Sequence, residues 1–473
     1  AQAIWLKASA QTEVQTIIAI IRIPCHRTAP LSMAACVKRA LALLALAVSV
    51  RGESASSACS AGDRCEIAGS KLLQARASRQ RSLLAVETEE DLEEDLEELA
   101  EEEAQESELQ GASIEEYNGA TITIHADSEV ARTGSGVWVI IVPENCTTYD
   151  VDQMADHMPK GTTPVFRGDP SHGGLCVFAM TGTKEQVLEE LDTHQWPSPP
   201  KIDSDKKWRY IDEIGLVETD EGNAGLLQQG GKPKSWGVDR VDDRKGLDND
   251  YSPLLTGDGV SVYVADTGIR TTHWDFKGRA IPTLEVLSPW RRVCDARDTQ
   301  CAVDREGHGT HCAGTIGGYW FGVAKGATLH AVKVIQDNRL GELSWFVEAL
   351  DWVMTSGLRP AVVSASLAGE GRSPTVDMTV DRATQSGVTV VVAAGNDGDT
   401  SKPSACSYTP ANAPAAITVG ATGYYDGRAS FSNYGTCVDI FAPGVSISSD
   451  TPEDDWAWNR KSGTSMACPH VAG

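Results

Sequence analysis

The last half of this 473-residue chain is predicted to form an α/β fold, a parallel sheet with helices on both faces. The first observation is a series of short, β-branched apolar runs, which are typical of strands buried on both sides. These runs lie at 260–265, 328–335, 361–366, 388–393 and 417–421. The second observation is helical periodicity between the runs. In 342–356 one helix face collects the apolar residues Leu343, Phe346, Val347, Leu350, Val353 and Met354.

Three glycine-bounded turns in this half carry side chains suited to catalysis. They are Asp266-Thr267-Gly268, Gly307-His308-Gly309-Thr310-His311 and Gly463-Thr464-Ser465-Met466-Ala467. Taken singly, they are a common turn, a histidine pair and a loop closed by a helix cap. The two histidines have no carboxylate motif beside them, which argues against a zinc site. Together, Asp266, His308 and Ser465 supply the acid, base and hydroxyl nucleophile that activate a serine.

The order of these residues along the chain selects among known folds. Asp, His, Ser is the order of subtilisin, and two other folds with the same triad use different orders. Segments 262–269, 307–317, 431–435 and 463–473 match the subtilisin family nearly without a break. Residues 236–473 therefore resemble a subtilase serine peptidase of the proteinase K and aqualysin type. Such relatives continue past the position of Gly473, so the resemblance implies a peptidase domain that is incomplete at its carboxyl end.

The resemblance implies a role for each residue of the site. Asp266, His308 and Ser465 become the catalytic triad, and Asn396 becomes the side-chain donor of the oxyanion hole. Asn396 follows the run 388–393, at the sheet edge where open parallel sheets bind ligands.

The helix that we expect to begin at Ser465 supplies a second donor. The first N–H groups of a helix have no partner within it and carry the positive end of its dipole, so the Ser465 amide is expected to bind the oxyanion. We place Pro469 in the first turn of this helix, where its missing N–H costs nothing. His308 is expected to open another helix, with Cys312 one turn later.

By resemblance, extended substrate pairs with two segments that also line the first specificity pocket. These are Ser366, Leu367 and Ala368, and Ala393, Ala394 and Gly395. Pairing of this kind recognises main chain more than side chain. Ala368 stands where relatives usually have glycine, and Arg339-Leu340 stands where Gly-Ser is usual. The preferred substrate side chain is therefore not readable from the sequence.

No cofactor is expected for the chemistry, but the resemblance implies a structural calcium ion. Asp439 with the carbonyl groups of Pro414 and Ala416 aligns with a proteinase K site. A carboxylate and main-chain oxygens suit a hard cation.

The twelve cysteines fit an oxidising compartment. By resemblance to aqualysin-like relatives, Cys406 pairs with Cys437. Cys294 and Cys301 are close enough to pin the loop before His308, and Cys146 and Cys176 form a third candidate pair. Cys312 resembles the buried free thiol of proteinase K. The alternative is a bond between Cys312 and Cys468 that joins the two catalytic helices.

A second folded unit is expected at 131–220. Its pattern is a strand at 137–142, helices at 150–158 and 184–193, and strands at 175–181 and 208–217, with Thr183 and Gln186 forming a capping box. This pattern resembles the inhibitor-type propeptide of subtilisins, a small α+β ferredoxin-like domain that occupies the active site until it is cut. We expect cleavage between about 217 and 232, within a processing linker at 221–235.

The amino-terminal region reads as a secretory leader and a spacer. Met33, basic residues and a short apolar stretch give residues 33–58 the layout of a signal peptide, which makes 1–32 an upstream or disordered segment. The net charge is −25, but fourteen acidic residues and no basic ones lie in 87–108. We therefore expect 59–130 to be an acidic disordered linker.

Three functions of different classes fit these observations. The first is a secreted endopeptidase made as a zymogen, with protein or peptide substrates and its own propeptide as intramolecular inhibitor. The second is an inactive or truncated relative that binds peptides or inhibits. The third is an acidic secreted protein whose functional part is 87–108. For the first we expect a monomer, no nucleic-acid partner and no membrane span.

Overall fold

The structure is a computed structural model that describes residues 112–144, 146–211, 235–287 and 290–473. These residues belong to one compact unit, Glu103–Gly473. The expectations for 1–32, for 33–58, for the acidic block and for nearly all of 221–235 lie outside the described residues and stay predictions.

The predicted parallel sheet is confirmed as the centre of the fold. It has eight strands in the order β10-β9-β11-β8-β13-β15-β17-β18. Every neighbouring pair from β9 to β18 is parallel, and only β10 runs antiparallel. The strands are β8 (Ser261–Asp266), β9 (Ala280–Leu287), β10 (Trp290–Val293), β11 (Thr328–Lys333), β13 (Ala361–Ala365), β15 (Val388–Ala393), β17 (Ile417–Thr422) and β18 (Ile440–Pro443).

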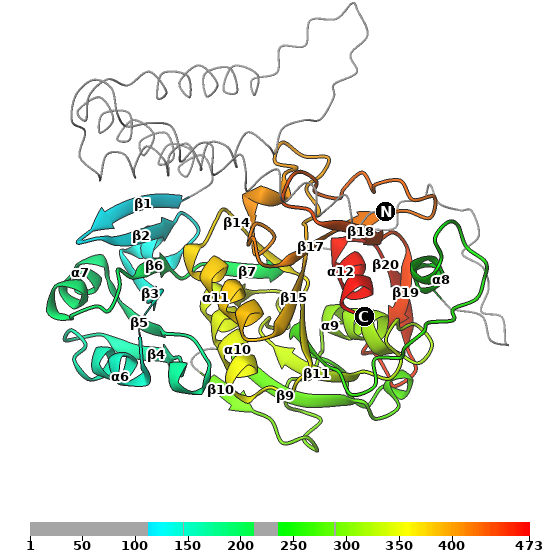
Figure 1. The fold of residues 1–473 in the computed structure, drawn as a ribbon, viewed down its shortest axis with the longest axis horizontal. Coiled ribbons are helices and arrows are strands. Elements are labelled where there is room, and N and C mark those ends of the chain that lie inside the picture. The colour runs from blue at the N-terminus through cyan, green and yellow to red at the C-terminus, as the bar shows by residue number, and fades with distance from the viewer. Residues whose placement is uncertain (1–111, 145, 212–234, 288–289) are drawn as a thin grey trace, which may run out of the picture. The chain divides into compact units, whose positions relative to one another are not determined.

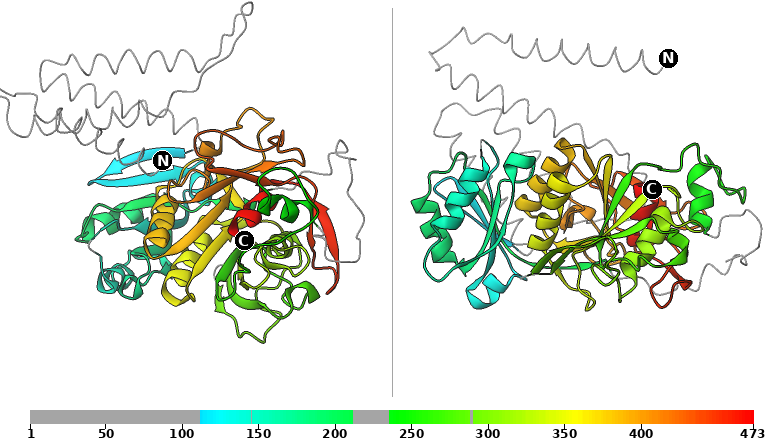
Figure 2. Two further views of the ribbon diagram at one scale, coloured as in Figure 1. Left: turned by 45° about the vertical axis from the view of Figure 1, so that its right-hand side comes forward. Right: turned by 90° about the horizontal axis from the view of Figure 1, so that it is seen from below.

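Two pairs of helices cover the faces of this sheet, as Figures 1 and 2 show. They are α9 (His308–Gly317) with α12 (Thr464–Ala472), and α10 (Leu343–Ser356) with α11 (Pro374–Gln385). Side chains of a strand point alternately to opposite faces. In β8, Val262 and Val264 pack in the core of α9 and α12, whereas Tyr263 and Ala265 pack in the core of α10 and α11.

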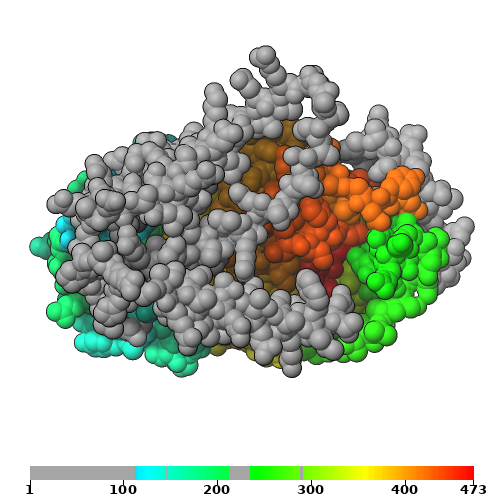
Figure 3. All heavy atoms as spheres, turned by 45° about the horizontal axis from the view of Figure 1, so that its top comes forward, coloured from blue at the N-terminus to red at the C-terminus, as the bar shows by residue number. Residues whose placement is uncertain are grey.

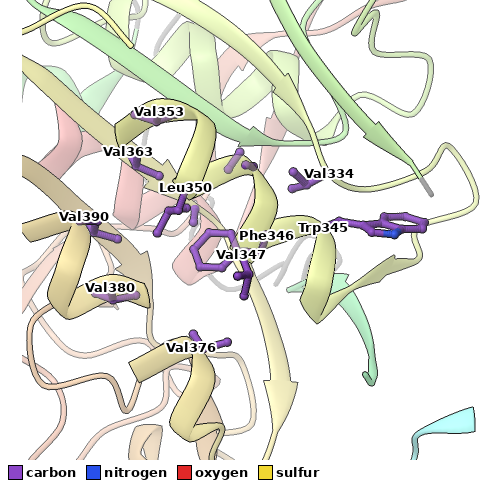
Figure 4. Packing of buried hydrophobic residues seen from close by; sticks show 14 of the residues in the cluster. Val334, Trp345, Phe346, Val347, Leu350, Val353, Val363, Val376, Val380 and Val390 are labelled. Atoms are coloured by element: carbon purple, nitrogen blue, oxygen red, sulfur yellow. The ribbon is translucent and has the colours of Figure 1, made fainter. Parts of the chain in front are cut away.

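The apolar stripe predicted in 342–356 is the buried face of α10. Figure 4 shows Phe346, Leu350 and Val353 directed towards Val363 of β13 and neighbouring side chains. All four are 1% exposed. At roughly 1.5–3 kcal/mol for each fully buried large apolar side chain, this stripe is what holds α10 against the sheet.

A second sheet lies earlier in the chain and begins before the predicted boundary at residue 131. Its order is β1-β2-β6-β3-β5-β4. Its elements are β1 (Ala112–Tyr117), β2 (Ala120–His125), α5 (Glu129–Thr133), β3 (Ser135–Ile141), α6 (Thr148–Asp156), β4 (Thr163–Arg167), β5 (Val177–Thr183), α7 (Lys184–Thr193) and β6 (Lys201–Ser204).

The placement of 112–130 in a disordered linker is therefore wrong. Glu115 and Glu116 are exposed on β1, which weakens its apolar pattern, but Ile122 of β2 is fully buried. The pairing of β2 with β6, distant in sequence, supplies the stability that the local pattern does not indicate.

The predicted elements within this unit are otherwise found near their expected positions. The helix at 184–193 matches α7, and both hydrogen bonds of the Thr183–Gln186 capping box are present. Of the strand expected at 208–217, residues 208–210 belong to β7, which begins at Lys207, and the part beyond Ile211 lies outside the described residues.

The remaining elements complete the described chain. They are α8 (Trp236–Asp242), β7 (Lys207–Tyr210), β12 (Gly341–Glu342), β14 (Leu367–Glu370), β16 (Tyr408–Thr409), β19 (Ile447–Asp450), β20 (Trp458–Lys461) and the short 3-10 turns η2 (Pro170–His172), η3 (Trp274–Phe276) and η4 (Ala405–Ser407). The segment with α8 is green in Figure 3 and adjoins the orange surface. Arg240 of α8 forms an ion pair with Asp426, with Nε and Oδ1 2.6 Å apart.

All three candidate disulfides are present: Cys146–Cys176, Cys294–Cys301 and Cys406–Cys437. No helix among the described residues combines the length and the hydrophobicity needed to cross a bilayer.

Candidate active site

Asp266 and His308 are in direct contact at the carboxyl edge of the sheet. Asp266 is the last residue of β8, and His308 is the first residue of α9, as predicted. His308 Nδ1 lies 2.8 Å from Asp266 Oδ1 and 2.9 Å from Oδ2. The two side chains are 0% and 1% exposed. This contact fixes the Nδ1–H tautomer of His308 and leaves Nε2 as the basic atom.

Asp304, which the sequence analysis did not single out, holds this arrangement in place. Its Oδ1 accepts hydrogen bonds from Thr267 Oγ1 at 2.9 Å and from Gly307 N at 2.8 Å. Its Oδ2 accepts one from Thr310 N at 2.9 Å, in the first turn of α9. A carboxylate at this place accepts hydrogen bonds from N–H groups that have no partner within the helix. Its negative charge also interacts favourably with the positive end of the helix dipole. No local motif marks such a residue, because its partners come from two separate turns.

The helix that bears His308 approaches the Asp266 turn closely. A Cβ atom at Gly309 would lie 2.2 Å from Gly268 O, so only glycine fits.

Ser465 lies in the first turn of α12, where a helix start was predicted. Its Oγ donates a hydrogen bond to Ile211 O, 3.2 Å away. His308 Nε2 is buried and has no hydrogen-bond partner among the described residues. The serine hydroxyl is thus directed at the carbonyl group of the residue that follows β7, and the lone pair of His308 Nε2 is not taken up by another described residue.

Pro469 lies in the second turn of α12, not in the first. A residue at this place would normally donate its N–H to the carbonyl of Ser465, four residues earlier, and proline cannot. Ser465 O instead accepts hydrogen bonds from Cys312 Sγ at 3.4 Å and from Ser366 Oγ at 3.1 Å. The prediction was wrong because Pro469 stands four residues after Ser465, which is beyond the first turn of 3.6 residues for a helix that begins at either Thr464 or Ser465.

Asn396 stands three residues beyond β15 and is tied to the start of α12. Its Oδ1 accepts hydrogen bonds from Thr464 N at 2.8 Å and from Thr464 Oγ1 at 3.0 Å. Because the amide oxygen is used there, the Nδ2 donor of Asn396 lies on the side of Gly463. A Cβ atom added at Gly463 would lie 3.0 Å from this Nδ2. A side chain at residue 463 would crowd this donor.

The strand β7 lies along the cleft beside these residues. Tyr210 and Arg209 pair antiparallel with Leu367 and Ala368 of β14. Ile211 N donates to Ser366 O at 3.3 Å. The predicted segment 366–368 therefore does bind an extended strand, and the methyl group of Ala368 does not prevent the pairing.

The second predicted segment, Ala393, Ala394 and Gly395, does not pair with β7. Ala393 belongs to β15 and is paired with Val419 of β17, and Ala394 N donates to Val419 O at 2.9 Å. The sheet uses main-chain groups of Ala393 and Ala394, whereas Gly395 N donates to Thr464 Oγ1 at 3.1 Å. A role of this segment in binding substrate stays a prediction. The second partner of β7 is β12, in which Gly341 pairs with Trp208.

Cys312 and Cys468 are free and buried, so the alternative of a disulfide between the two catalytic helices is wrong. Burial raises the pKa of the Cys312 thiol well above its usual value and that of Cys468 to about 11. Both thiols therefore stay protonated and act as small apolar side chains with a weak donor.

The proposed calcium ligands Asp439, Pro414 and Ala416 stay a prediction. Asp439 Oδ2 accepts a hydrogen bond from Thr418 N at 2.8 Å, so part of its carboxylate is already used. A different set of carboxylates, Asp239, Asp243 and Asp248, brings ligand atoms within 4.8 Å of one another. Such oxygens are of the type that hard cations prefer, but Asp239 already accepts hydrogen bonds from Asp248 N and Asn249 N.

Comparisons with known proteins show what this chain is similar to. The model of the subtilase family matches residues 257–473. An extracellular serine proteinase of Thermus sp. (strain Rt41A) is 47% identical over 266 residues, which are 56% of this chain and 61% of that protein. Alkaline serine exoprotease A of Vibrio alginolyticus is 40% identical over 331 residues, which are 70% of this chain and 55% of that protein.

A solved structure is also similar. It is a cold adapted subtilisin-like serine proteinase, 42% identical, with a TM-score of 0.46, and the match covers 50% of this chain and 82% of that one. The chain thus spans 61% and 55% of the length of the two named sequence relatives.

Proposed function

We propose that this chain, whose residues 257–473 match the subtilase family of serine peptidases, is a secreted endopeptidase, made as a zymogen, that cuts its own chain after Ile211. The observation that carries the proposal is the position of Ile211. Its N–H donates to Ser366 O at 3.3 Å, and its carbonyl oxygen accepts from Ser465 Oγ at 3.2 Å. A strand held by its main chain with a carbonyl at the nucleophile has the geometry of a bound substrate.

The site performs acyl transfer in two steps. Ser465 Oγ attacks the carbonyl carbon of Ile211 while His308 Nε2 takes its proton, and Asp266 stabilises the imidazolium that forms. Asn396 Nδ2 and the Ser465 amide stabilise the oxyanion. His308 then gives the proton to the amine of residue 212 as the peptide bond breaks. Water attacks the acyl-enzyme in the same way and releases the Ile211 carboxylate. Subtilases need no cofactor for this chemistry.

The same strand supports a role of residues 112–211 as an intramolecular inhibitor. After cleavage at Ile211, the pairing of β7 with β12 and β14 is intact, so the strand still fills the cleft. Lys206, immediately before β7, is 1% exposed, and its ammonium group donates to Glu370 O. Activity therefore requires that the inhibitory unit be removed or degraded. The expected cleavage region of 217–232 lies outside the described residues, and the geometry favours the bond after Ile211 instead.

Secretion is supported by the three disulfides and by the name of the Thermus relative. Substrates are proteins or peptides bound in extended conformation along β14.

Two versions of the full-length precursor test the proposal, one native and one with Ser465→Ala. After expression into an oxidising compartment, mass spectrometry of the products should find an amino terminus at Asp212 in the native protein only. A fluorophosphonate probe should then label Ser465 once the inhibitory unit is gone. If the native protein is folded but neither cleaves itself nor reacts with the probe, the catalytic role is wrong and a peptide-binding or inhibitory relative is favoured.

A further inference from the structure

A carboxylate and a guanidinium meet at the edge of the cleft, over the side chain that precedes Ile211. Tyr210 is 1% exposed, and its ring is stacked on the ring of His308, with centroids 4.0 Å apart and an interplanar angle of 18°. Its hydroxyl donates to Glu306 Oε1 at 2.9 Å. Arg339 Nη2 lies 3.1 Å from the same oxygen, and Arg339 Cζ lies 5.5 Å from the centre of the Tyr210 ring.

We propose that Glu306 and Arg339 form a subsite that selects tyrosine at the substrate residue immediately before the one whose carbonyl is attacked. The inference rests on the proposed function, because it concerns the substrate of that same site. It goes beyond that function by naming the side chain that the cleft prefers and the two residues that choose it.

The carboxylate of Glu306 is fixed before a substrate arrives. Its Oε2 accepts a hydrogen bond from His308 N at 3.0 Å, in the first turn of α9. With β7 in place, the Glu306 side chain is only 8% exposed. A nearly buried carboxylate oxygen loses its water when the strand binds, so a substrate side chain that donates to it is favoured over one that cannot.

Arg339 decides which donor is accepted. A lone carboxylate at this place would attract lysine or arginine. The guanidinium of Arg339 already neutralises Glu306, and it would repel a second cation brought by the substrate. A neutral hydroxyl on a flat apolar ring satisfies all three neighbours: it donates to Glu306, stacks on His308 and lies beneath Arg339.

The backbone at Arg339 supports a role for its side chain. Its φ is 74°, in the left-handed region that favours glycine. The turn is closed by Arg339 N donating to Gln336 O at 3.0 Å and by Gln336 N donating to Leu340 O at 2.8 Å. An arginine here carries a conformational cost that glycine would avoid, and the turn directs its guanidinium at Glu306.

Other charged groups face this pair. Arg305 Nη1 lies 3.7 Å from Asp337 Oδ2, and Lys333 Nζ lies 2.7 Å from Asp337 Oδ1. The Arg305–Asp337 contact links the turn before α9 to the turn that follows β11, and the Lys333–Asp337 contact ties the second turn to the end of β11.

The test compares peptides within one enzyme preparation. Enzyme matured from the full-length precursor is assayed on fluorogenic peptides with the sequence Lys-Trp-Arg-X-Ile before the cleaved bond, where X is Tyr, Phe, Ala or Lys. We expect kcat/KM for Tyr to exceed that for Phe by about tenfold or more, the size of one hydrogen bond to a charged group. Because the ratio is taken within one preparation, it does not depend on the fraction of active enzyme.

Two variants assign the preference to the proposed residues. Glu306→Gln should lower the Tyr to Phe ratio severalfold, because a neutral amide oxygen accepts a weaker hydrogen bond than a carboxylate. Arg339→Gly should raise the Lys to Tyr ratio about tenfold or more, because it leaves the carboxylate without its cation. Equal rates for Tyr and Phe with the native enzyme would overturn the inference, as would an unchanged ratio in Glu306→Gln or an unchanged Lys to Tyr ratio in Arg339→Gly. If no peptide is cut in a manner that depends on Ser465, the proposed function itself has failed.

Discussion

The carboxylate of Asp205 caps the helix that begins beside Ser344. Asp205 Oδ1 accepts a hydrogen bond from Ser344 N at 3.0 Å, and Oδ2 accepts one from Ser344 Oγ. Helix α10 has no side-chain cap of its own. The cap of a helix in the peptidase domain is therefore supplied by the unit that precedes β7, and both groups are buried.

Removal of this cap should destabilise the precursor. In a Ser465→Ala background, Asp205→Ala is expected to lower the free energy of unfolding by about 2 kcal/mol, measured by denaturant titration, because it leaves buried N–H and hydroxyl donors unpaired. Asp152→Ala is a suitable control, since its ion pair with Arg167 is exposed and should change stability by less than about 0.5 kcal/mol. Equal effects of the two substitutions would contradict the capping role.

Loss of the Asn396 donor should slow the chemistry without unfolding the protein. Asn396→Ala is expected to reduce kcat by about 10²–10³-fold, the size known for removal of such a donor in subtilisin. Thr464→Val removes the hydroxyl that donates to Asn396 Oδ1 and accepts from Gly395 N, but it leaves the Asn396 donor in place and should cost less, about tenfold. Steady-state kinetics on the best peptide measures both. If Asn396→Ala keeps native kcat, the oxyanion role is wrong.

His330 should make the stability of the protein depend on pH. It is 5% exposed and stacked on Tyr263, with ring centroids 4.5 Å apart. Burial lowers its pKa from 6.5 to about 4. The unfolded chain therefore takes up a proton below about pH 6.5 that the folded chain does not, so the stability contributed by neutral His330 is present above that pH and is lost as pH falls towards about 4.

The measurement compares His330→Phe with the native residue in the Ser465→Ala background. Denaturant titration gives the free energy of unfolding of each protein at about pH 7.5 and about pH 4.5. The decrease between these pH values should be smaller in the variant than in the parent, by roughly 2–3 kcal/mol. Parallel pH profiles would show that the ring is not held neutral.

Cys312 and Cys468 should resist alkylation until the protein unfolds. Both are 0% exposed, and burial raises the pKa of each thiol, so little thiolate forms and no reagent reaches it. Site-resolved mass spectrometry after treatment with iodoacetamide should find both thiols unmodified in folded protein and fully modified in denaturant. Modification of Cys312 in the folded state at the denatured rate would contradict the packing described here.

The sequence predicts the central sheet and the contact between Asp266 and His308 well, because both depend on local patterns, and the catalytic roles of Asp266, His308 and Ser465 stay a prediction. The five apolar runs became neighbouring parallel strands, and Asp266, His308 and Ser465 lie in short glycine-bounded motifs. Residues whose partners are distant in sequence were harder to predict. Asp304 is one polar residue in a loop, and its importance follows from contacts with two separate turns.

Two further features could not be predicted, because they depend on which strands pair in the folded structure. The sequence does not show that β7 pairs with β12 and β14 and not with 393–395, whose role in binding substrate stays a prediction. The pairing of β7 with β12 could not be read, since Gly341 and Glu342 alone have no strand pattern. The contact between Glu306 and Arg339 likewise depends on how two loops pack against each other.

The carbonyl of Ser465, which Pro469 leaves without a helical partner, gives the nucleophile two external anchors. One is Cys312 on the helix of the base, and the other is Ser366 at the edge that receives the substrate strand. The three segments to which the proposed mechanism assigns the nucleophile, the base and the substrate strand thus meet at a single oxygen atom. A strand that distorts the cleft edge would therefore shift the backbone of the attacking residue as well, so a poorly fitting substrate is handicapped at the reacting bond and not only in its binding.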